Sequence, residues 1–113
     1  MIDYDTRVAR GAALLDEKLP GWWQRVDLDR LDLSKCTDCV LGQLTGDYDS
    51  MATTLLIGPR ANKYPLRGNA KAARLGFTLP PSDAEWLSPM RLAEWAALTA
   101  AWKRLIESRR SQS

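Results

Sequence analysis

A single long helix near the C-terminus constrains the fold of this chain more than any other feature. Ser88 followed by Pro89 is a typical helix start, because the serine caps free N–H groups and proline in the first turn has no N–H to leave unpaired. An apolar stripe follows at spacings of three, four and three residues: Trp95, Leu98, Trp102 and Leu105. We expect a helix from Ser88 to about Arg109 and a frayed tail over about 110–113.

The same helix carries a second surface made of small side chains: Ala93, Ala96, Ala97, Ala100 and Ala101. Small side chains let another helix approach closely, because the distance between packed helices depends on the residues at the contact. That helix would belong either to the same chain or to a second copy. The sequence therefore allows a monomer or a homodimer.

Another helix is expected near the N-terminus, from Thr6 to Lys18. Its apolar face repeats at spacings of four, three and four residues: Val8, Ala12, Leu15 and Leu19. Asp5 or Thr6 can cap its start, and Pro20-Gly21 ends it. The residues that follow, 22–26, fit a helical turn that anchors two large rings.

The middle of the chain predicts further short helices between turn residues. Ser34 is a suitable cap for a helix that runs through Leu44, with Gly46 as its stop. Two more short helices are expected, from Asp49 or Ser50 to Ile57 and from Asn69 to Leu75, the latter closed by Gly76. Residues 26–33 fit a short extended stretch and two helical turns equally well.

The totals of the chain fit one soluble domain. Its 113 residues can bury a single modest core, and 45% hydrophobic with 27% charged residues is ordinary for a globular protein. No apolar run approaches the roughly 18 residues of a membrane span, and the first residues do not look like a secretory signal. We expect a mainly α, compact domain spanning 1–113, with four to five helices and few or no strands, located in the cytoplasm.

The two halves of the chain carry opposite charge. Residues 1–50 contain ten acidic and six basic side chains, a net charge of −4, whereas residues 51–113 contain four acidic and ten basic ones, a net charge of +6. Either the halves fold against each other, or the second half faces an acidic partner.

Cys36 and Cys39 form a CxxC motif, which has three interpretations. Burial is favoured, because the two cysteines share an apolar helical face with Val40 and Leu44 and unpaired cysteine is a commonly buried residue type. A local disulfide or redox role is the second. A zinc site is the third, and it requires four ligands in a chain without histidine, so two chains must share it or Asp38 must contribute. Otherwise we expect no cofactor.

Aromatic side chains offer the best candidates for a protein interface. The clusters of aspartates lack a histidine or a nucleophile–base pair beside them, so we expect no enzyme. Trp22 and Trp23 are adjacent and cannot both face inward in a regular element, which leaves one ring available to a partner. The expected partner-binding residues are Trp22, Trp23, Arg25 and Tyr48.

A basic stretch without acids offers an alternative, nucleic-acid binding. Its cations recur at spacings of three, four, four and three residues: Arg60, Lys63, Arg67, Lys71 and Arg74. Cations arranged in this way suit contact with phosphates. Pro65 and Gly68 interrupt the stretch, however, and argue against one continuous helix.

Parts of the chain resemble small proteins of unknown function from actinobacteria and their bacteriophages. The resemblance covers residues 7–18, Pro20-Gly21-Trp22-Trp23, the run from Cys36 to Tyr48, and residues 97–106. It implies a phage or prophage accessory protein in the bacterial cytoplasm, and it carries over no activity and no functional residue. We therefore expect a non-enzymatic accessory protein that binds a host or phage macromolecule, in the first place a protein.

Overall fold

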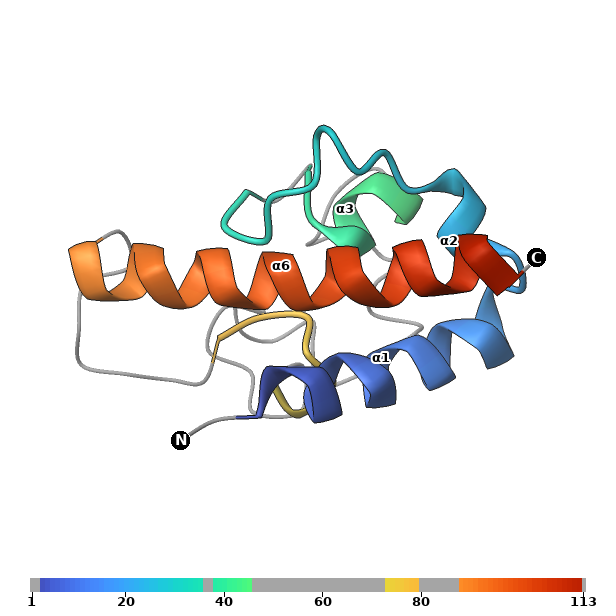
Figure 1. Ribbon diagram of the computed structural model, residues 1–113, viewed down its shortest axis with the longest axis horizontal. Helices are drawn as coiled ribbons and strands as arrows, with labels where there is room; N and C mark the ends of the chain where they lie inside the picture. Colours follow the sequence, from blue (N-terminus) through green and yellow to red (C-terminus); the bar gives the residue numbers. More distant parts are fainter. Residues whose placement is uncertain (1–2, 36–37, 46–72, 80–87, 113) are drawn as a thin grey trace.

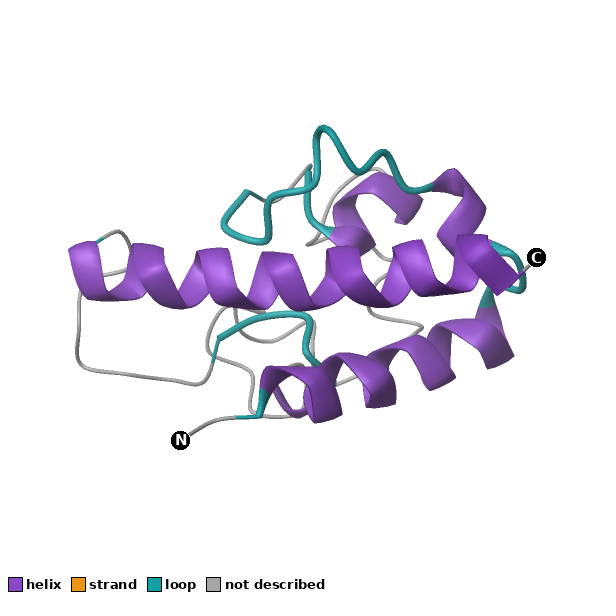
Figure 2. Cartoon of the chain, viewed as in Figure 1, coloured by secondary structure: helices purple, strands orange, loops and turns teal. Residues whose placement is uncertain are grey.

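The computed structural model describes residues 3–35, 38–45, 73–79 and 88–112. These ranges contain four helices and no strand (Figures 1 and 2): α1 (Tyr4–Lys18), α2 (Trp22–Arg25), α3 (Val40–Thr45) and α6 (Pro89–Gln112). The expected mainly α architecture with a long C-terminal helix is confirmed. The helix expected at 49–57 and residues 69–72 of the helix expected at 69–75 lie outside the described residues, whereas residues 73 and 74 are helical. No helix within the described ranges is long and apolar enough to cross a membrane.

Helix α6 starts where the sequence predicts and ends later. The Ser88 carbonyl accepts the Leu92 N–H at 2.8 Å, and its hydroxyl oxygen accepts the Arg91 N–H at 3.4 Å. The helix continues to Gln112, so the expectation that residues 110–112 fray is wrong. Arg110 explains the difference, because its guanidinium donates to the carbonyls of Trp23 and Val26 and anchors the last turn to the end of α2.

Helix α1 begins at Tyr4, earlier than the expected start at Thr6. The cap is Asp3, whose Oδ1 accepts the Thr6 N–H at 3.1 Å, so the expected cap at Asp5 or Thr6 is wrong. The Thr6 hydroxyl donates to the other oxygen of the same carboxylate and so reinforces this cap. The helix ends at Lys18, as expected.

Trp102 lies at the centre of the core, between α1, α2 and residues 73–79. Its ring stacks on Phe77 at 5.6 Å between ring centroids and meets the edge of Trp22 at 5.8 Å and 88°. Its indole N–H donates to the Gly76 carbonyl at 2.6 Å. In Figure 1, α1 and α6 lie along each other and run in the same direction, with the segment 73–79 crossing beside them. One ring thus joins parts of the chain that are far apart in sequence.

Gly76 ends the turn at residues 73–76 with a left-handed backbone, φ +75°, as expected of a helix stop. A Cβ atom at this position would lie 2.8 Å from the Val8 nitrogen. At Gly11, a Cβ atom would lie 2.0 Å from the Leu75 carbonyl oxygen. Glycine at these two positions lets α1 and residues 73–79 pack backbone against backbone.

The helix expected from Ser34 to Leu44 is much shorter in the structure, where α3 spans Val40–Thr45. Ser34 is not its cap. Instead its N–H and its hydroxyl both donate to Asp32 Oδ1, at 3.0 and 2.6 Å, which closes a local turn. The adjacent Leu33 N–H donates to Thr99 Oγ1 at 3.1 Å and fastens this loop to α6. Residues 26–33 therefore form turns, neither the extended stretch nor the two helical turns that the sequence allowed.

Two ion pairs join the acidic first half of the chain to the basic second half. The Arg109 guanidinium donates to both carboxylate oxygens of Asp16 at 2.8 Å each, and Arg104 pairs with Asp5 at 2.8 Å. Both pairs connect α1 to α6. The opposite charges are therefore matched, at least in these two places, within one chain.

Candidate functional site

Among the described residues that the sequence proposed for protein binding, Trp22 is not part of the surface. Trp22 is fully buried, and its indole N–H donates to Asp16 Oδ1 at 2.9 Å. Its ring is therefore not available to a partner in this structure, which corrects the expectation for this residue. Trp23 is half-buried against the core, Arg25 is exposed, and Tyr48 lies outside the described residues.

The basic stretch and the cysteine pair are described only in part. Arg74 is exposed, whereas Arg60, Lys63, Arg67 and Lys71 lie outside the described residues. Cys39 is buried just before α3, and its sulfur accepts the Gly42 N–H at 3.2 Å. Cys36 lies outside the described residues, and the described ranges hold no group of three potential metal ligands. Nucleic-acid binding and a shared zinc or redox site remain predictions.

The first half of α6 exposes only apolar side chains between residues 89 and 97. We call these residues the outer face: Pro89, Met90, Leu92, Ala93, Ala96 and Ala97. Met90 and Leu92 are the large ones, with 59% and 47% of their surface exposed. The two charged residues of this stretch do not interrupt the face, because Arg91 is buried and its guanidinium pairs with the half-buried Glu94 at 2.9 Å.

The second half of α6 has a different outer surface. Its exposed residues are all polar: Arg104, Glu107, Ser108, Arg110, Ser111 and Gln112. The change along one helix is informative, because a helix surface that faces only water is normally polar, and a contiguous apolar patch is typical of an interaction site.

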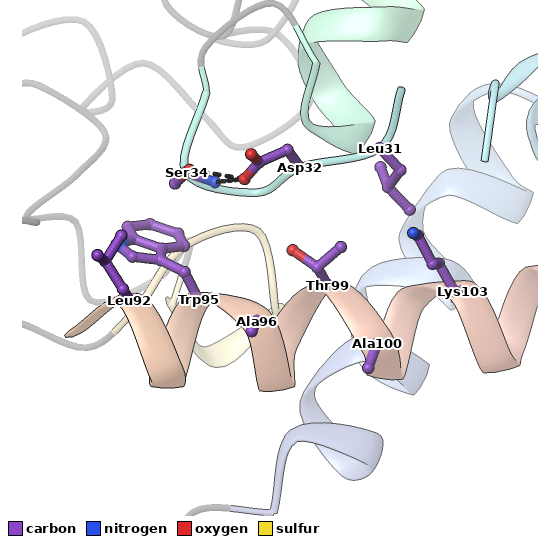
Figure 3. Close-up of a pocket in the computed structure, with 9 residues that line it drawn as sticks. All are labelled: Leu31, Asp32, Ser34, Leu92, Trp95, Ala96, Thr99, Ala100 and Lys103. Carbon is purple, nitrogen blue, oxygen red and sulfur yellow. Dashed lines mark hydrogen bonds between the residues drawn. The ribbon is translucent and has the colours of Figure 1, made fainter. Parts of the chain in front are cut away.

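A groove lies beside the outer face, between α6 and the loop at residues 31–34 (Figure 3). It is open to solvent and has a volume of about 380 Å³. Residues from both walls line it: Leu31, Asp32 and Ser34 from the loop, and Leu92, Trp95, Ala96, Thr99, Ala100 and Lys103 from α6. Leu92 and Trp95 lie toward one end and Lys103 toward the other. Leu92 and Ala96 belong to both the groove and the outer face.

The loop wall of the groove is held in place by the hydrogen bonds already described. Asp32 fixes Ser34, and Thr99 fixes Leu33, whose side chain is buried in the core. Leu31 is also buried. The groove is thus bounded by a loop with anchored residues and by a helix, and both walls are largely formed before any ligand arrives.

Charge is sparse in the groove. Among the described residues, the ion pairs join Arg30 with Asp38, Arg91 with Glu94, Arg104 with Asp5 and Arg109 with Asp16, and none includes Lys103. Asp32 uses Oδ1 to accept both hydrogen bonds from Ser34. The groove therefore offers apolar contacts from both walls, the Asp32 carboxylate on the loop wall and the Lys103 ammonium group near one end.

Asp16, whose pKa is perturbed, lies away from the groove. Hydrogen bonds from Arg109 hold the pKa of Asp16 below its ordinary value, partial burial opposes this, and the Trp22 indole N–H adds to the lowering. The same pair raises the pKa of Arg109. Because the Asp16 carboxylate of α1 accepts hydrogen bonds from both α2 and α6, we assign it a structural role.

Sequence reasoning identified the small alanines of α6 but missed the outer face as a whole. Met90 and Leu92 fall outside the stripe that contains Trp95 and Trp102, so a search for one buried face passes over them. A helical-wheel plot of every apolar residue between 89 and 100 would have shown more apolar residues than one buried face accounts for. The groove was not predictable, because its second wall comes from a loop that is 60 or so residues earlier in the chain.

No known protein family, curated protein or solved structure matches this chain. The function must therefore be argued from the residues themselves, and the resemblance to proteins of actinobacteria and their phages remains a prediction.

Proposed function

We propose that this protein acts by binding another protein through the outer face of α6 and the adjoining groove. The observation that supports the proposal is the uniformly apolar exposed surface between residues 89 and 97, on a helix whose other half exposes only polar residues. Burial of apolar surface gives roughly 25 cal/mol per Å², so a partner that covers Met90 and Leu92 gains affinity from that contact.

The chemistry of the surface supports a binding role in preference to catalysis. Leu92 and the alanines provide shape and apolar area, while the charges are the Asp32 carboxylate on the loop wall and the Lys103 ammonium group on α6. Such a surface suits recognition by a protein, with the exposed Leu92 at one end of the groove as an apolar contact and the buried Trp95 beneath it as support. We place the protein among phage or prophage accessory proteins on the basis of the sequence resemblance, with a host or phage protein as the partner.

Site-specific photo-crosslinking tests this proposal. A photoreactive amino acid replaces Leu92 in one variant and Glu107 in a matched control, since both positions are exposed on α6 but only the first lies on the outer face. We expect the Leu92 variant, expressed in the cells that encode the protein, to form a discrete adduct with another protein. Adducts of equal yield from both positions, or none from Leu92, would contradict the proposal.

A further inference from the structure

We infer that the groove between α6 and residues 31–34 takes one amphipathic helix of the partner, which places an acidic side chain against Lys103. This inference rests on the proposed function and names the element of the partner that is recognised. It follows from three properties of the groove: its shape, its length and its distribution of charge.

The shape suits a helix. Ala96 and Ala100 on the α6 wall have side chains short enough for another helix to approach closely, and the loop wall adds contacts from the other side. The hydrogen bond from Leu33 to Thr99 keeps the walls together, so the site is preformed. A helix laid in an apolar groove is a common mode of peptide recognition.

The length determines what the partner helix must carry. Leu92 and Lys103 are separated by eleven residues of α6, which corresponds to about 16 Å at roughly 1.5 Å per residue. About three turns of a partner helix cover this distance. Apolar anchors spaced by three or four residues would contact Leu92, Ala96 and Ala100, and the residue near the far end would reach Lys103.

The positive charge of Lys103 determines which charge the partner residue at this end of the groove must carry. Lys103 lines the groove and enters none of the ion pairs among the described residues, whereas the adjacent Arg104 is paired with Asp5. A partner carboxylate can therefore pair with Lys103 without displacing an existing contact. A basic residue at the same position of the partner would be repelled by Lys103.

A displayed library of helix-constrained peptides tests the inference, with the purified full-length protein as bait. Ala96→Arg fills the groove, and Ala13→Arg is the matched control, because Ala13 is equally an exposed helical alanine but belongs to neither the groove nor the outer face. We expect the selected peptides to share an apolar face and an aspartate or glutamate at one fixed position. Their affinity should fall at least about tenfold for Ala96→Arg and stay nearly unchanged for Ala13→Arg.

A charge reversal tests the role of Lys103. Lys103→Glu should weaken the selected peptides by about tenfold, and exchange of the peptide's acidic residue for lysine should restore binding to this variant. Alanine methyl signals in NMR spectra show where the peptides bind, since Ala100 reports on the groove alone and Ala93 and Ala97 on the outer face alone.

Distinct results would overturn the inference. If no peptide is enriched, or if the enriched peptides bind Ala96→Arg unchanged, the groove does not take a helix. If the Ala93 and Ala97 signals shift with protein concentration alone, the outer face binds a second copy. If crosslinking at Leu92 captures a partner whose binding survives both Ala96→Arg and Lys103→Glu, the helix-in-groove inference fails while the proposed function stands.

Discussion

At the scale of single residues, glycine and tryptophan set the geometry of this core. Gly11 and Gly76 lack the side chains that would separate α1 from residues 73–79, and Trp102 packs beside Gly11 and stacks on Phe77. The sequence predicted that Trp22 and Trp23 could not both face inward, but not which one is buried. That choice depends on Asp16 and Trp102, and the distant Trp102 cannot be linked to Trp22 by local spacing.

We predict that Gly11→Ala destabilises the protein. Alanine favours a helix over glycine by about 1 kcal/mol, but the new methyl group would lie 2.0 Å from the Leu75 carbonyl oxygen, and overpacking costs typically about 1–3 kcal/mol. The clash with backbone should outweigh the helix propensity, which urea denaturation can measure. Ala13→Gly, at an exposed position of α1, measures the propensity term alone. A Gly11→Ala variant as stable as the wild type would show that the segment at Leu75 can move away.

At the scale of elements, the two long helices were largely predictable and the region around Ser34 was not. Helix α6 has a local start signal, Ser88-Pro89, and the Ser88 hydroxyl accepts the Arg91 N–H as the signal predicts. Ser34 looks like an equally good cap, but Asp32 is two residues before it and binds its N–H and hydroxyl. A competing side chain therefore converted an expected helix start into a turn.

We predict that Asp3→Ala lowers the thermal stability of the protein more than Asp5→Ala does. Asp3 caps α1 through the Thr6 N–H, whereas Asp5 makes only an exposed ion pair with Arg104. Thermal unfolding followed by circular dichroism compares the two variants directly. Asp3→Asn should retain most of the stability, because asparagine is also a good cap. Equal losses for Asp3→Ala and Asp5→Ala would contradict the assignment of the cap.

We predict that Thr99→Val loosens the loop wall of the groove. The Leu33 N–H would lose its acceptor, and a partly buried N–H without a partner costs about 1–3 kcal/mol. Hydrogen exchange at the Leu33 amide should become faster, and the free energy of unfolding should fall. Thr99→Ser keeps the hydroxyl and serves as the control. Unchanged exchange in Thr99→Val would mean that this bond does not hold the loop.

At the scale of the whole molecule, the charge asymmetry of the sequence has a partial structural explanation. The sequence left open whether the two oppositely charged halves contact each other or a partner. In the structure, the ion pairs Arg104–Asp5 and Arg109–Asp16 join the halves between α1 and α6. The surface that these ion pairs do not involve carries the information about binding. The outer face is apolar, and Lys103 has no ion pair in the described part of the chain. Sequence periodicity finds what a helix buries, but not which other surfaces stay uncovered after folding.

We predict that Asp16 contributes stability that is lost in acid. Its pKa is lowered in the folded protein, so the unfolded chain binds the proton more readily, and the contribution is present above about pH 4 and disappears as the pH falls through the lowered pKa. The difference in unfolding free energy between wild type and Asp16→Asn should therefore narrow from pH 7 toward pH 2. Urea denaturation at each pH measures it.

Arg109→Gln supplies the control for that series. Because the guanidinium is the main cause of the lowered pKa, the effect of Asp16→Asn should depend much less on pH in the Arg109→Gln background. A pH dependence that persists unchanged without Arg109 would assign it to other groups.

The pairing of α1 with α6 also has a consequence for synthesis of the protein on the ribosome. About 70 residues separate the end of α1 at Lys18 from the start of α6 at Pro89. At roughly 5–20 residues per second, the ribosome needs on the order of 4–14 s to add them. Throughout that interval, Val8, Ala12 and Leu15 lack the Trp102 side of their core. Until its last helix emerges, we therefore expect the nascent chain to expose apolar surface that a chaperone can bind.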